Sequence, residues 1–263
     1  MDCFAGKAAV VSGAASGIGF ALCHLLCARG ALVHAFDRDA AGLERLRIAC
    51  GSENLRASIL DVADEKAVAA LLGQVVEAHG HLDYLFNNAG IYMRGETENM
   101  TTDAWCRIVD VNLWGVIHGT QHGYALMLKQ GYGHIVNTAS TAGLTPLAKS
   151  VAYAATKHAV VGLSLSLREE ARTHGIRVSV VVPGIVDTGI FASATSLRGQ
   201  DIAAAMQRAP VGKISAEQAA RTILQGVTAN RRLIVFPFYN RALTWLYRLF
   251  PDALGRLINR VDV

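Results

Sequence analysis

Seven short runs of mainly aliphatic residues recur along this chain of 263 residues, separated by stretches with helical periodicity. The runs occupy residues 7–12, 31–36, 54–60, 82–86, 135–139, 177–182 and 232–236. Continuous Val, Ile and Leu runs that alternate with helices are typical of a parallel sheet covered on both faces. The pattern therefore predicts an α/β fold with a doubly wound parallel sheet of about seven strands.

Helical periodicity fills the intervals between these runs. Helices are expected from the glycine-rich turn after the first run to about residue 29, and at residues 65–79, 102–130, 153–173 and 217–229. Thr101 or Thr102 is the expected N-cap residue of the longest helix, and Asn112 lies inside that helix.

Composition limits the class of protein. Hydrophobic residues make up 52% of the chain and charged residues 17%, which excludes a disordered chain. Asp2 precedes the first apolar run without a basic segment, and every apolar stretch of about 18 residues contains charge, so neither a signal peptide nor a membrane span is expected. Five cysteines without a C-x-x-C pair favour free thiols and a cytoplasmic location. The nine histidines lack ligand spacing, so no metal site is expected.

Residues 13–19, with the sequence Gly-Ala-Ala-Ser-Gly-Ile-Gly, follow the first predicted strand and open the first predicted helix. A glycine-rich turn in this position lets the backbone approach a pyrophosphate, which then lies at the helix N-terminus. Such glycines often serve packing alone. Here the order strand, turn, helix, strand favours a Rossmann-type fold that binds a dinucleotide.

The second predicted strand ends at Asp37, which is followed by Arg38. A carboxylate at this point accepts hydrogen bonds from the adenosine ribose hydroxyls and repels a 2′-phosphate, although Asp37 also fits a turn-initiating role. An arginine just past the strand can instead bind a 2′-phosphate. The glycine turn adds no basic residue, so we predict NAD as cofactor, with NADP as the alternative.

Tyr153 and Lys157 are four residues apart, so their side chains share one face of the predicted helix. An isolated tyrosine has a pKa of about 10, and a nearby ammonium lowers that pKa. The phenol then works as general base toward an alcohol, or as acid in the reverse step. Ser140, after the fifth predicted strand, is placed to hold the reacting oxygen. Alone, a Tyr-x-x-x-Lys pair is common and also fits an exposed helix.

Several of these positions share one location in the predicted sheet. The glycine turn, Asp37, Asp61, Asn88, Ser140 and Pro183 all follow the carboxyl ends of predicted strands. Ligands of open α/β sheets bind outside these ends, so we expect the residues to meet in one site.

These motifs, in this order along nearly the whole chain, resemble the short-chain dehydrogenase/reductase family. The matching pieces are residues 12–19, Asp61 and Val62, residues 87–90, Asn112, Ser140, the Tyr153-x-x-x-Lys157 pair and residues 183–188. The family usually has Thr at the position of Ser12, which keeps the hydroxyl. The resemblance implies an oxidoreductase that transfers hydride between an alcohol or ketone and a nicotinamide, in a homotetramer or homodimer.

The resemblance also implies roles for individual residues. Tyr153 would be the catalytic acid/base, Lys157 would hold the nicotinamide ribose, Ser140 would orient the substrate oxygen, and Asn112 would hold a water of a proton relay. Asn112 could otherwise be a helix-interior asparagine that mends a local kink, and its family position is what favours the relay. The implied cofactor-binding residues are Gly13, Ser16, Gly17, Ile18, Gly19, Asp37, Arg38, Asp61, Val62, Asn88, Ala89, Gly90, Tyr153, Lys157, Pro183, Gly184, Val186 and Thr188.

Three segments are expected to wall the substrate side: residues 91–94, residues 141–151 and a lid at about 189–212. The candidate substrate residues are Tyr92, Leu144, Leu147, Ile190 and Phe191, and Met93, Pro146, Leu197 and Met206 extend the apolar surface. An apolar pocket with few charges suits a bulky uncharged alcohol or ketone, such as a steroid, terpenoid, retinoid or long-chain alcohol. Packing of the lid alone would also explain these residues.

Residues 240–263 are expected to form a basic tail after a single domain that spans residues 1–239. Residues 231–263 contain six arginines and two aspartates, which account for the whole net charge of +4, so the body offers no basic patch for nucleic acid. Leu243, Leu246, Tyr247 and Phe250 are spaced as one apolar helical face, and Pro251 ends this helix. Such a helix packs on its own domain or a neighbouring subunit, or it lies on an anionic membrane surface.

The sequence therefore predicts an NAD-dependent dehydrogenase that oxidises a secondary alcohol, with Tyr153 taking the proton. An NADPH-dependent ketoreductase is the alternative that Arg38 allows and Asp37 opposes. A non-catalytic dinucleotide sensor or scaffold is a third hypothesis, against which the complete set of Asn112, Ser140, Tyr153 and Lys157 argues.

Overall fold

The computed structural model describes residues 3–190, 194–196 and 212–258. The candidate substrate residue Phe191 and most of the expected lid, including Leu197 and Met206, lie outside the described residues. In the described part of the chain, no helix combines the length and the apolar character needed to cross a membrane.

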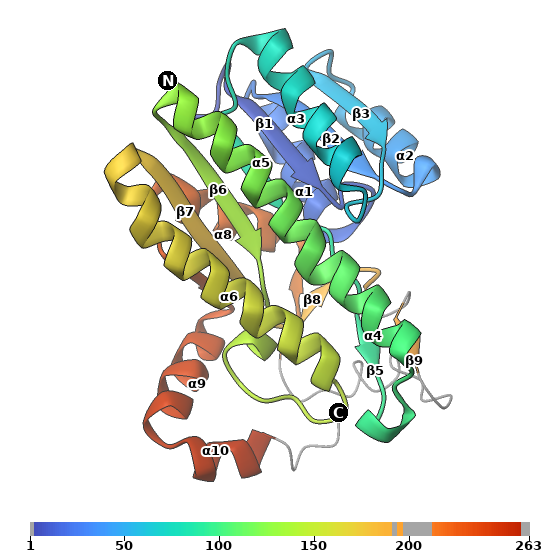
Figure 1. Ribbon diagram of the computed structural model, residues 1–263, viewed down its shortest axis with the longest axis vertical. Coiled ribbons are helices and arrows are strands. Elements are labelled where there is room, and N and C mark those ends of the chain that lie inside the picture. Colours follow the sequence, from blue (N-terminus) through green and yellow to red (C-terminus); the bar gives the residue numbers. More distant parts are fainter. Residues whose placement is uncertain (1–2, 191–193, 197–211, 259–263) are drawn as a thin grey trace.

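A seven-stranded parallel sheet forms the centre of the molecule (Figure 1), which confirms the predicted architecture. Its strands are β1 (Ala8–Ser12), β2 (Leu32–Asp37), β3 (Leu55–Ile59), β4 (Tyr84–Asn87), β6 (Gly133–Thr138), β7 (Ile176–Pro183) and β11 (Leu233–Phe236). Their spatial order is β11-β7-β6-β4-β1-β2-β3, and in this register Ala9 of β1 lies between Val33 of β2 and Tyr84 of β4. The chain order therefore reverses between β1 and β4, and a ligand site is expected outside that point.

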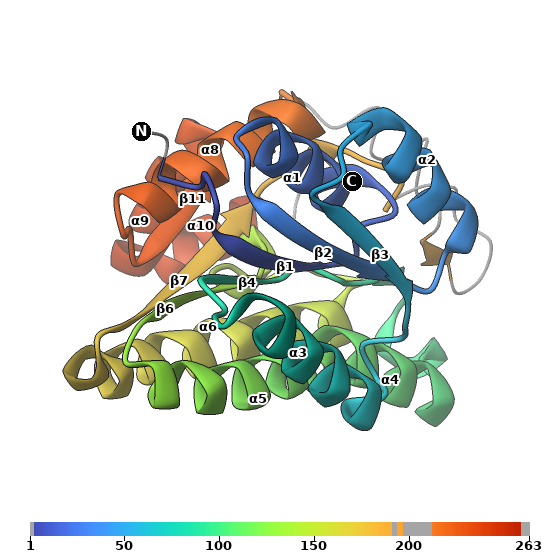
Figure 2. The same cartoon turned by 90° about the horizontal axis from the view of Figure 1, so that it is seen from above.

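Helices cover both faces of the sheet (Figure 2). One face carries α1 (Gly17–Ala28), α2 (Ala40–Cys50) and α8 (Ala216–Thr228), and the other carries α3 (Glu65–His79), α4 (Thr102–Val109), α5 (Gly115–Gln130) and α6 (Val151–Ala171). Every residue of β1 and all but one residue of β7 are buried. This double burial explains why the strands are continuous aliphatic runs.

The ends of the helices follow local chemistry. At the N-termini of α2 and α3, the side chains of Asp39 and Asp64 accept hydrogen bonds from backbone N–H groups, and both helices end at a glycine in the left-handed conformation. Helix α2 is absent from the helices expected from the sequence. The reason is its weak apolar pattern, since Gly42, Leu43 and Leu46 are its only fully buried residues.

The helix expected over residues 102–130 consists of two α-helical parts in one rod. Thr101 caps α4 by accepting a hydrogen bond from the backbone N–H of Ala104. A π-helical segment, Asp110–Trp114, then joins α4 to α5. Asn112 lies in this wider turn and is completely buried, so the segment carries a polar side chain into the interior.

Short elements complete the carboxyl edge of the sheet. β5 (Met93–Arg94) pairs with β9 (Thr195–Ser196), and β8 (Val186–Asp187) pairs with β10 (Ile214–Ser215). The C-terminal segment forms α9 (Phe238–Leu249), which packs on β11, and α10 (Pro251–Ile258), which packs on α9. Helix α9 thus begins before the expected domain boundary at residue 240, and Pro251 also starts a helix, because proline suits a first helical position.

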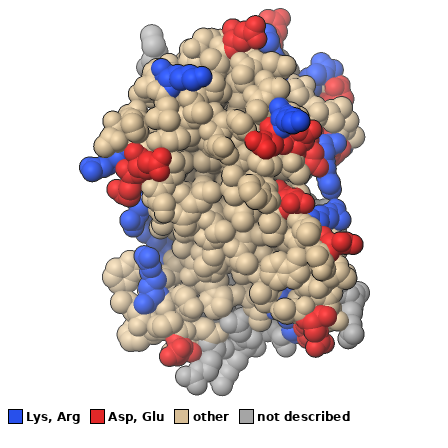
Figure 3. All heavy atoms as spheres, in the orientation of Figure 1, with Lys and Arg blue, Asp and Glu red and all other residues tan. Residues whose placement is uncertain are grey.

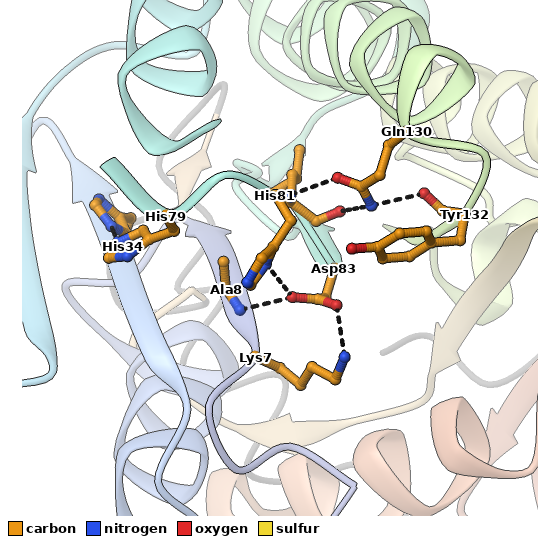
Figure 4. Close-up of polar contacts among 9 residues, drawn as sticks. Lys7, Ala8, His34, His79, His81, Asp83, Gln130 and Tyr132 are labelled. Carbon is orange, nitrogen blue, oxygen red and sulfur yellow. Dashed lines mark hydrogen bonds and ion pairs between the residues drawn. The ribbon is translucent and has the colours of Figure 1, made fainter. Parts of the chain in front are cut away.

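The opposite, amino-terminal edge of the sheet carries a polar network (Figure 4). Asp83 accepts hydrogen bonds from Lys7 Nζ at 3.1 Å and from the backbone N–H of Ala8 at 2.9 Å, and one of its oxygens lies 2.7 Å from Nδ1 of His81. Nearby, the Nε2 atoms of His34 and His79 are 2.8 Å apart. Asp83 ties the start of β1 to the start of β4, and the histidine pair joins β2 to the end of α3.

Candidate active site

The end of β1 leads into the glycine turn at the carboxyl edge. Gly13 has a φ of +66°, and a Cβ there would lie 2.7 Å from Cα of Ala89, so only glycine fits. The turn opens α1, whose N-cap residue Ser16 makes no side-chain capping hydrogen bond and whose first turn contains no acidic residue. This helix N-terminus is therefore suited to an anionic group of a ligand.

The hydroxyl of Ser12 fastens the loop after β4 to the end of β1. Its oxygen accepts hydrogen bonds from the backbone N–H groups of Asn88 at 2.9 Å and Ala89 at 3.1 Å. In return, Nδ2 of Asn88 donates to the carbonyl oxygens of Ser12 and Gly13, at 3.2 and 3.4 Å. Asn88 and Ala89 are thereby held at the point where the strand order reverses.

The carboxylate of Asp37 is fixed by two backbone N–H groups. Oδ2 accepts a hydrogen bond from Ala15 in the glycine turn at 3.1 Å, and Oδ1 accepts one from Asp39 at 3.0 Å. The glycine turn and the end of β2 are thus joined through this side chain. Its remaining lone pairs are available to hydroxyl donors of a ligand.

Ser140, Tyr153 and Lys157 come together from the end of β6 and from α6. Oγ of Ser140 accepts a hydrogen bond from the backbone N–H of Ala142 at 3.2 Å. Nζ of Lys157 donates to the carbonyl oxygen of Thr138 at 3.0 Å and lies 5.7 Å from the centroid of the Tyr153 ring. The last residue of β6, Thr138, therefore holds the lysine beside the tyrosine.

The protonation equilibria of this pair differ from the expectation that Lys157 lowers the pKa of Tyr153. Burial raises the pKa of Tyr153 to about 12, while its hydrogen bond with Ser140 acts in the opposite direction. Burial also lowers the pKa of Lys157 to about 8. Removal of the phenol from water has the larger effect on its pKa, and the ammonium of Lys157 is itself engaged by the carbonyl oxygen of Thr138. At neutral pH the phenol is protonated and the lysine is mainly charged.

Asn112 holds the loop after β4 through both ends of its amide. Oδ1 accepts a hydrogen bond from the backbone N–H of Ile91 at 2.8 Å, and Nδ2 donates to the carbonyl oxygen of Ile91 at 2.9 Å. Nδ2 also lies 3.4 Å from Oγ1 of Thr156, on the helix that carries the tyrosine. These contacts bind the π-helical segment to both the loop and α6.

One cavity of about 490 Å³ unites these residues at the carboxyl edge of the sheet. Among the predicted site residues, those that line it are Gly13, Ser16, Gly17, Ile18, Asp37, Arg38, Asp61, Val62, Asn88, Ala89, Gly90, Tyr92, Ser140, Leu147, Tyr153, Lys157, Pro183, Gly184, Val186, Thr188 and Ile190. Residues from β2, β6 and α6 and from the loops that follow β1 and β4 thus face a single space.

Four predicted positions lie elsewhere in the described structure. Gly19 is buried behind the glycine turn against the carbonyl oxygen of Gly13, and Asn112 is enclosed by its own hydrogen bonds. Leu144 packs beside Val160 and Val161 in a core cluster, because the short turn at Thr141–Gly143 directs it inward. Met93 is likewise buried in the core.

Several residues of the site escaped the sequence analysis. Tyr239, Asn240 and Leu243 of α9 line the cavity, so the C-terminal segment forms part of its wall. The hydroxyl of Tyr92 lies 2.8 Å from Oγ of Ser150, which precedes α6. Asn240 follows the end of β11, and other site residues also follow strand ends. This position in the sequence could have identified Asn240 as a site residue.

Comparison with known proteins agrees with this geometry. Residues 7–198 match the family model described as short chain dehydrogenase. The oxidoreductase named SadH of Mycobacterium tuberculosis is 35% identical over 98% of this chain and 96% of its own length. Levodione reductase of Leifsonia aquatica is 34% identical over 70% of this chain and 71% of its own length.

Solved structures agree as well. A short-chain dehydrogenase/reductase from Burkholderia phymatum in complex with NAD superposes with a TM-score of 0.87 at 31% identity, with 96% of each chain covered. The crystal structure of levodione reductase gives a TM-score of 0.77 at 28% identity, covering 88% of this chain and 95% of that chain. With the family model matched over most of its length and the expected residues gathered in one cavity, the chain belongs to the short-chain dehydrogenase/reductase family and is an oxidoreductase.

Proposed function

We propose that this protein is an NAD-dependent dehydrogenase that oxidises a bulky, lipophilic secondary alcohol to a ketone. The observation that carries the proposal is the content of one cavity, which is lined by the glycine turn, by Asp37 and by Ser140, Tyr153 and Lys157. Groups suited to hold a dinucleotide and groups suited to move a proton therefore share one space.

The residues present fit a nicotinamide dinucleotide. A Cβ on Gly90 would lie 3.3 Å from Oδ1 of Asn112 and 3.4 Å from Nζ of Lys157, so glycine keeps space open beside the lysine. The N-terminus of α1 suits the pyrophosphate, and Lys157 suits the hydroxyls of the nicotinamide ribose. The Burkholderia phymatum neighbour, described in complex with NAD, supports this assignment. When bound, the nicotinamide accepts the hydride.

Asp37 supports NAD over NADP. Its two oxygens are held in place by backbone N–H groups, so the negative charge cannot turn away from the cavity. A fixed carboxylate accepts hydrogen bonds from ribose hydroxyls and repels a 2′-phosphate.

Tyr153 is the group that would exchange a proton with the substrate. Ser140 would hold the substrate oxygen by a hydrogen bond, so that this oxygen lies between Ser140 and Tyr153. For oxidation, Tyr153 must be in the phenolate form to take the proton of the alcohol, and Lys157, which carries positive charge at neutral pH, favours that form. Thr138 fixes the position of this positive charge, because its carbonyl oxygen accepts a hydrogen bond from Nζ of Lys157 at 3.0 Å.

The walls of the cavity favour an apolar substrate. Tyr92, Leu147 and Ile190 line it together with Ile185 and Leu243. A ligand of matching character buries apolar surface against these side chains, while Ser140 and Tyr153 fix its one reacting oxygen. A bulky, uncharged secondary alcohol combines these properties.

Carbonyl reduction with NADPH is the second candidate. With a pKa of about 12, Tyr153 is protonated at neutral pH, which is the form that donates a proton to a carbonyl oxygen. Arg38 also lines the cavity beside Asp37 and offers a partner for a 2′-phosphate. The relative named levodione reductase is consistent with this direction.

Titration of the full chain with NADH and with NADPH separates the two candidates. We expect NADH to bind at least about tenfold more tightly, and we expect Asp37→Ser to reduce or reverse that ratio. Turnover of lipophilic secondary alcohols with NAD should follow. Tighter binding of NADPH by the wild-type chain would overturn the NAD assignment, and tight NADH binding without turnover of any alcohol or ketone would favour a non-catalytic sensor.

A further inference from the structure

Helix α9 has two faces of different character. Its inner face contains the buried residues Asn240 and Thr244 and the half-buried residues Leu243 and Tyr247. Part of this face lines the cavity of the active site. The sequence analysis placed Leu246 and Phe250 on one apolar face with Leu243 and Tyr247, and the structure exposes Leu246 and Phe250.

The outer face of α9 exposes large apolar side chains. Phe238 is 85% exposed, Trp245 66% and Leu249 55%, and their spacing of seven and four residues places them on one line along the helix. Leu246, 45% exposed, widens this line. Figure 1 places α9 and α10 at the periphery of the molecule, beyond the sheet and its covering helices. Isolated surface apolar residues are ordinary, but a contiguous row with two aromatic rings marks an interaction surface.

The charges on α9 itself have one sign. Residues 231–250 contain four arginines and no aspartate or glutamate. Two of them, Arg241 and Arg248, are exposed on α9 and flank the row on one side. In Figure 3 the surface over α9 and α10 is largely uncharged, with basic side chains near α9 and an acidic side chain at the lower edge, where α10 lies. A second copy docked symmetrically through α9 would bring these arginines close to one another, whereas an anionic surface would be attracted by them.

We propose that the outer face of α9, defined by Phe238, Trp245, Leu246 and Leu249 and flanked by Arg241 and Arg248, docks on the surface of an anionic lipid bilayer. A helix lying in the interface buries its apolar side chains at the headgroup boundary and keeps its arginines at the phosphate level. Tryptophan suits this boundary because its ring is apolar and its N–H is polar.

Docking in this orientation has a geometric consequence for the active site. Tyr239, Asn240 and Leu243, on the opposite side of the same helix, line the cavity. One helix would therefore separate the lipid surface from the cavity. This link to catalysis rests on the proposed lipophilic substrate, but lipid binding itself does not depend on the reaction.

Vesicle co-sedimentation of the full chain tests the proposal. We expect binding to phosphatidylcholine vesicles that contain phosphatidylglycerol, and much weaker binding to phosphatidylcholine alone or at high salt. The double variant Trp245→Ser/Leu249→Ser should bind the anionic vesicles at least about tenfold more weakly, as should Arg241→Gln/Arg248→Gln. The matched control is Ile48→Ser on α2, which replaces an apolar residue that is 67% exposed and should bind like the wild type.

NADH titration of the same variants provides the control for folding and keeps the test separate from the proposed reaction. The variants should retain the NADH affinity of the wild type, and that result holds whether or not a substrate is found. Absence of vesicle binding by the wild type, or equal binding by the wild type and the apolar double variant, would overturn the proposal. A sedimentation coefficient that falls in the apolar double variant, without any lipid, would assign the face to a second copy instead.

Discussion

The ring of Tyr92 meets the ring of Tyr153 edge to face, with 4.9 Å between centroids and 83° between planes. The hydroxyl of Tyr92 is held 2.8 Å from Oγ of Ser150, one residue before the helix that carries Tyr153. Tyr92 thus links the loop after β4 to α6 and fixes the direction of the phenol ring of Tyr153.

Replacement of Tyr92 separates the two contacts. Tyr92→Phe keeps the ring and loses the hydrogen bond to buried Ser150, so we expect kcat to fall about fivefold, the equivalent of about 1 kcal/mol. Tyr92→Leu also loses the aromatic contact and should lower kcat by at least about tenfold. Steady-state kinetics measures both variants. An unchanged NADH affinity in both would identify a positioning role, and equal kcat in Tyr92→Leu and the wild type would contradict it.

Tyr153→Phe removes the proton-transferring hydroxyl and preserves the ring. General acid–base catalysis contributes at least about 100-fold, so we expect a loss of turnover of that size or greater. The dissociation constant of NADH should change by less than about threefold. Tyr132→Phe is the matched control, because Tyr132 is exposed and directly precedes β6, at the amino-terminal edge of the sheet, opposite the site. Retained turnover in Tyr153→Phe would exclude the mechanism.

Gly184→Ala should disturb the contact between the site and α9. A Cβ on Gly184 would lie 1.8 Å from Nδ2 of Asn240, whose side chain is buried. We expect a loss of stability of about 1–3 kcal/mol, as found for overpacked interiors, together with weaker substrate binding. Urea unfolding and KM measure the two effects.

A second substitution provides the control for this steric explanation. Asn240→Ala removes the clashing amide, so the double variant Gly184→Ala/Asn240→Ala should recover part of the stability lost in Gly184→Ala. Additive losses in the two single variants would mean that the residues act independently.

Stability should fall in mild acid because two buried histidines resist protonation. Burial lowers the pKa of His134 to about 3, and burial, with the charges of His79 and Arg56, lowers the pKa of His34 to about 4. An unfolded histidine has a pKa of about 6.5, so below that pH the unfolded state binds more protons and becomes favoured. The contribution of neutral His134 is fully present above pH 6.5 and is lost progressively down to about pH 3.

Urea unfolding at pH 7.5 and 5.5 measures this effect. The loss from His134 over this interval should be on the order of 1 kcal/mol. His134→Gln can keep a hydrogen bond to Ser179, whose Oγ lies 2.8 Å from Nε2 of His134, and should show a shallower pH dependence. The exposed residue His174 provides the control substitution, His174→Gln. An identical slope in His134→Gln and the wild type would contradict the assignment.

The strands of the sheet could be predicted from the sequence, because strands such as β1 and β7 are buried on both faces and therefore appear as continuous aliphatic runs. Helix α2 could not be recognised in the same way, since only Gly42, Leu43 and Leu46 are buried and most of the helix faces solvent. Motif spacing located Asp37, Ser140 and Tyr153, all of which line the cavity.

Contacts between distant segments were beyond sequence reasoning. Helix α9 has apolar residues on nearly all sides, so its pattern could not indicate that Asn240 and Thr244 would face inward while Trp245 faced outward. The raised pKa of Tyr153 likewise depends on burial beside Tyr92, which only the fold provides. The periodicity of apolar residues indicates how apolar one face of a helix is, but it does not indicate which part of the protein contacts that face.

The π-helical segment between α4 and α5 limits how the length of this chain can change. A π-helical turn holds one residue more than an α-helical turn, so removing one residue from Asp110–Trp114 would let the rod close into a continuous α-helix and leave α5 in register on the sheet. A deletion between this segment and Gly119 would instead turn the rest of α5 by about 100°, and Gly119 and Gly123 would no longer face Asn87 and Leu85 of β4, where any larger residue would clash. Single-residue deletions in this rod should therefore be tolerated at the π-helical segment and not within α5, and they would remove the wider turn that carries Asn112 inward.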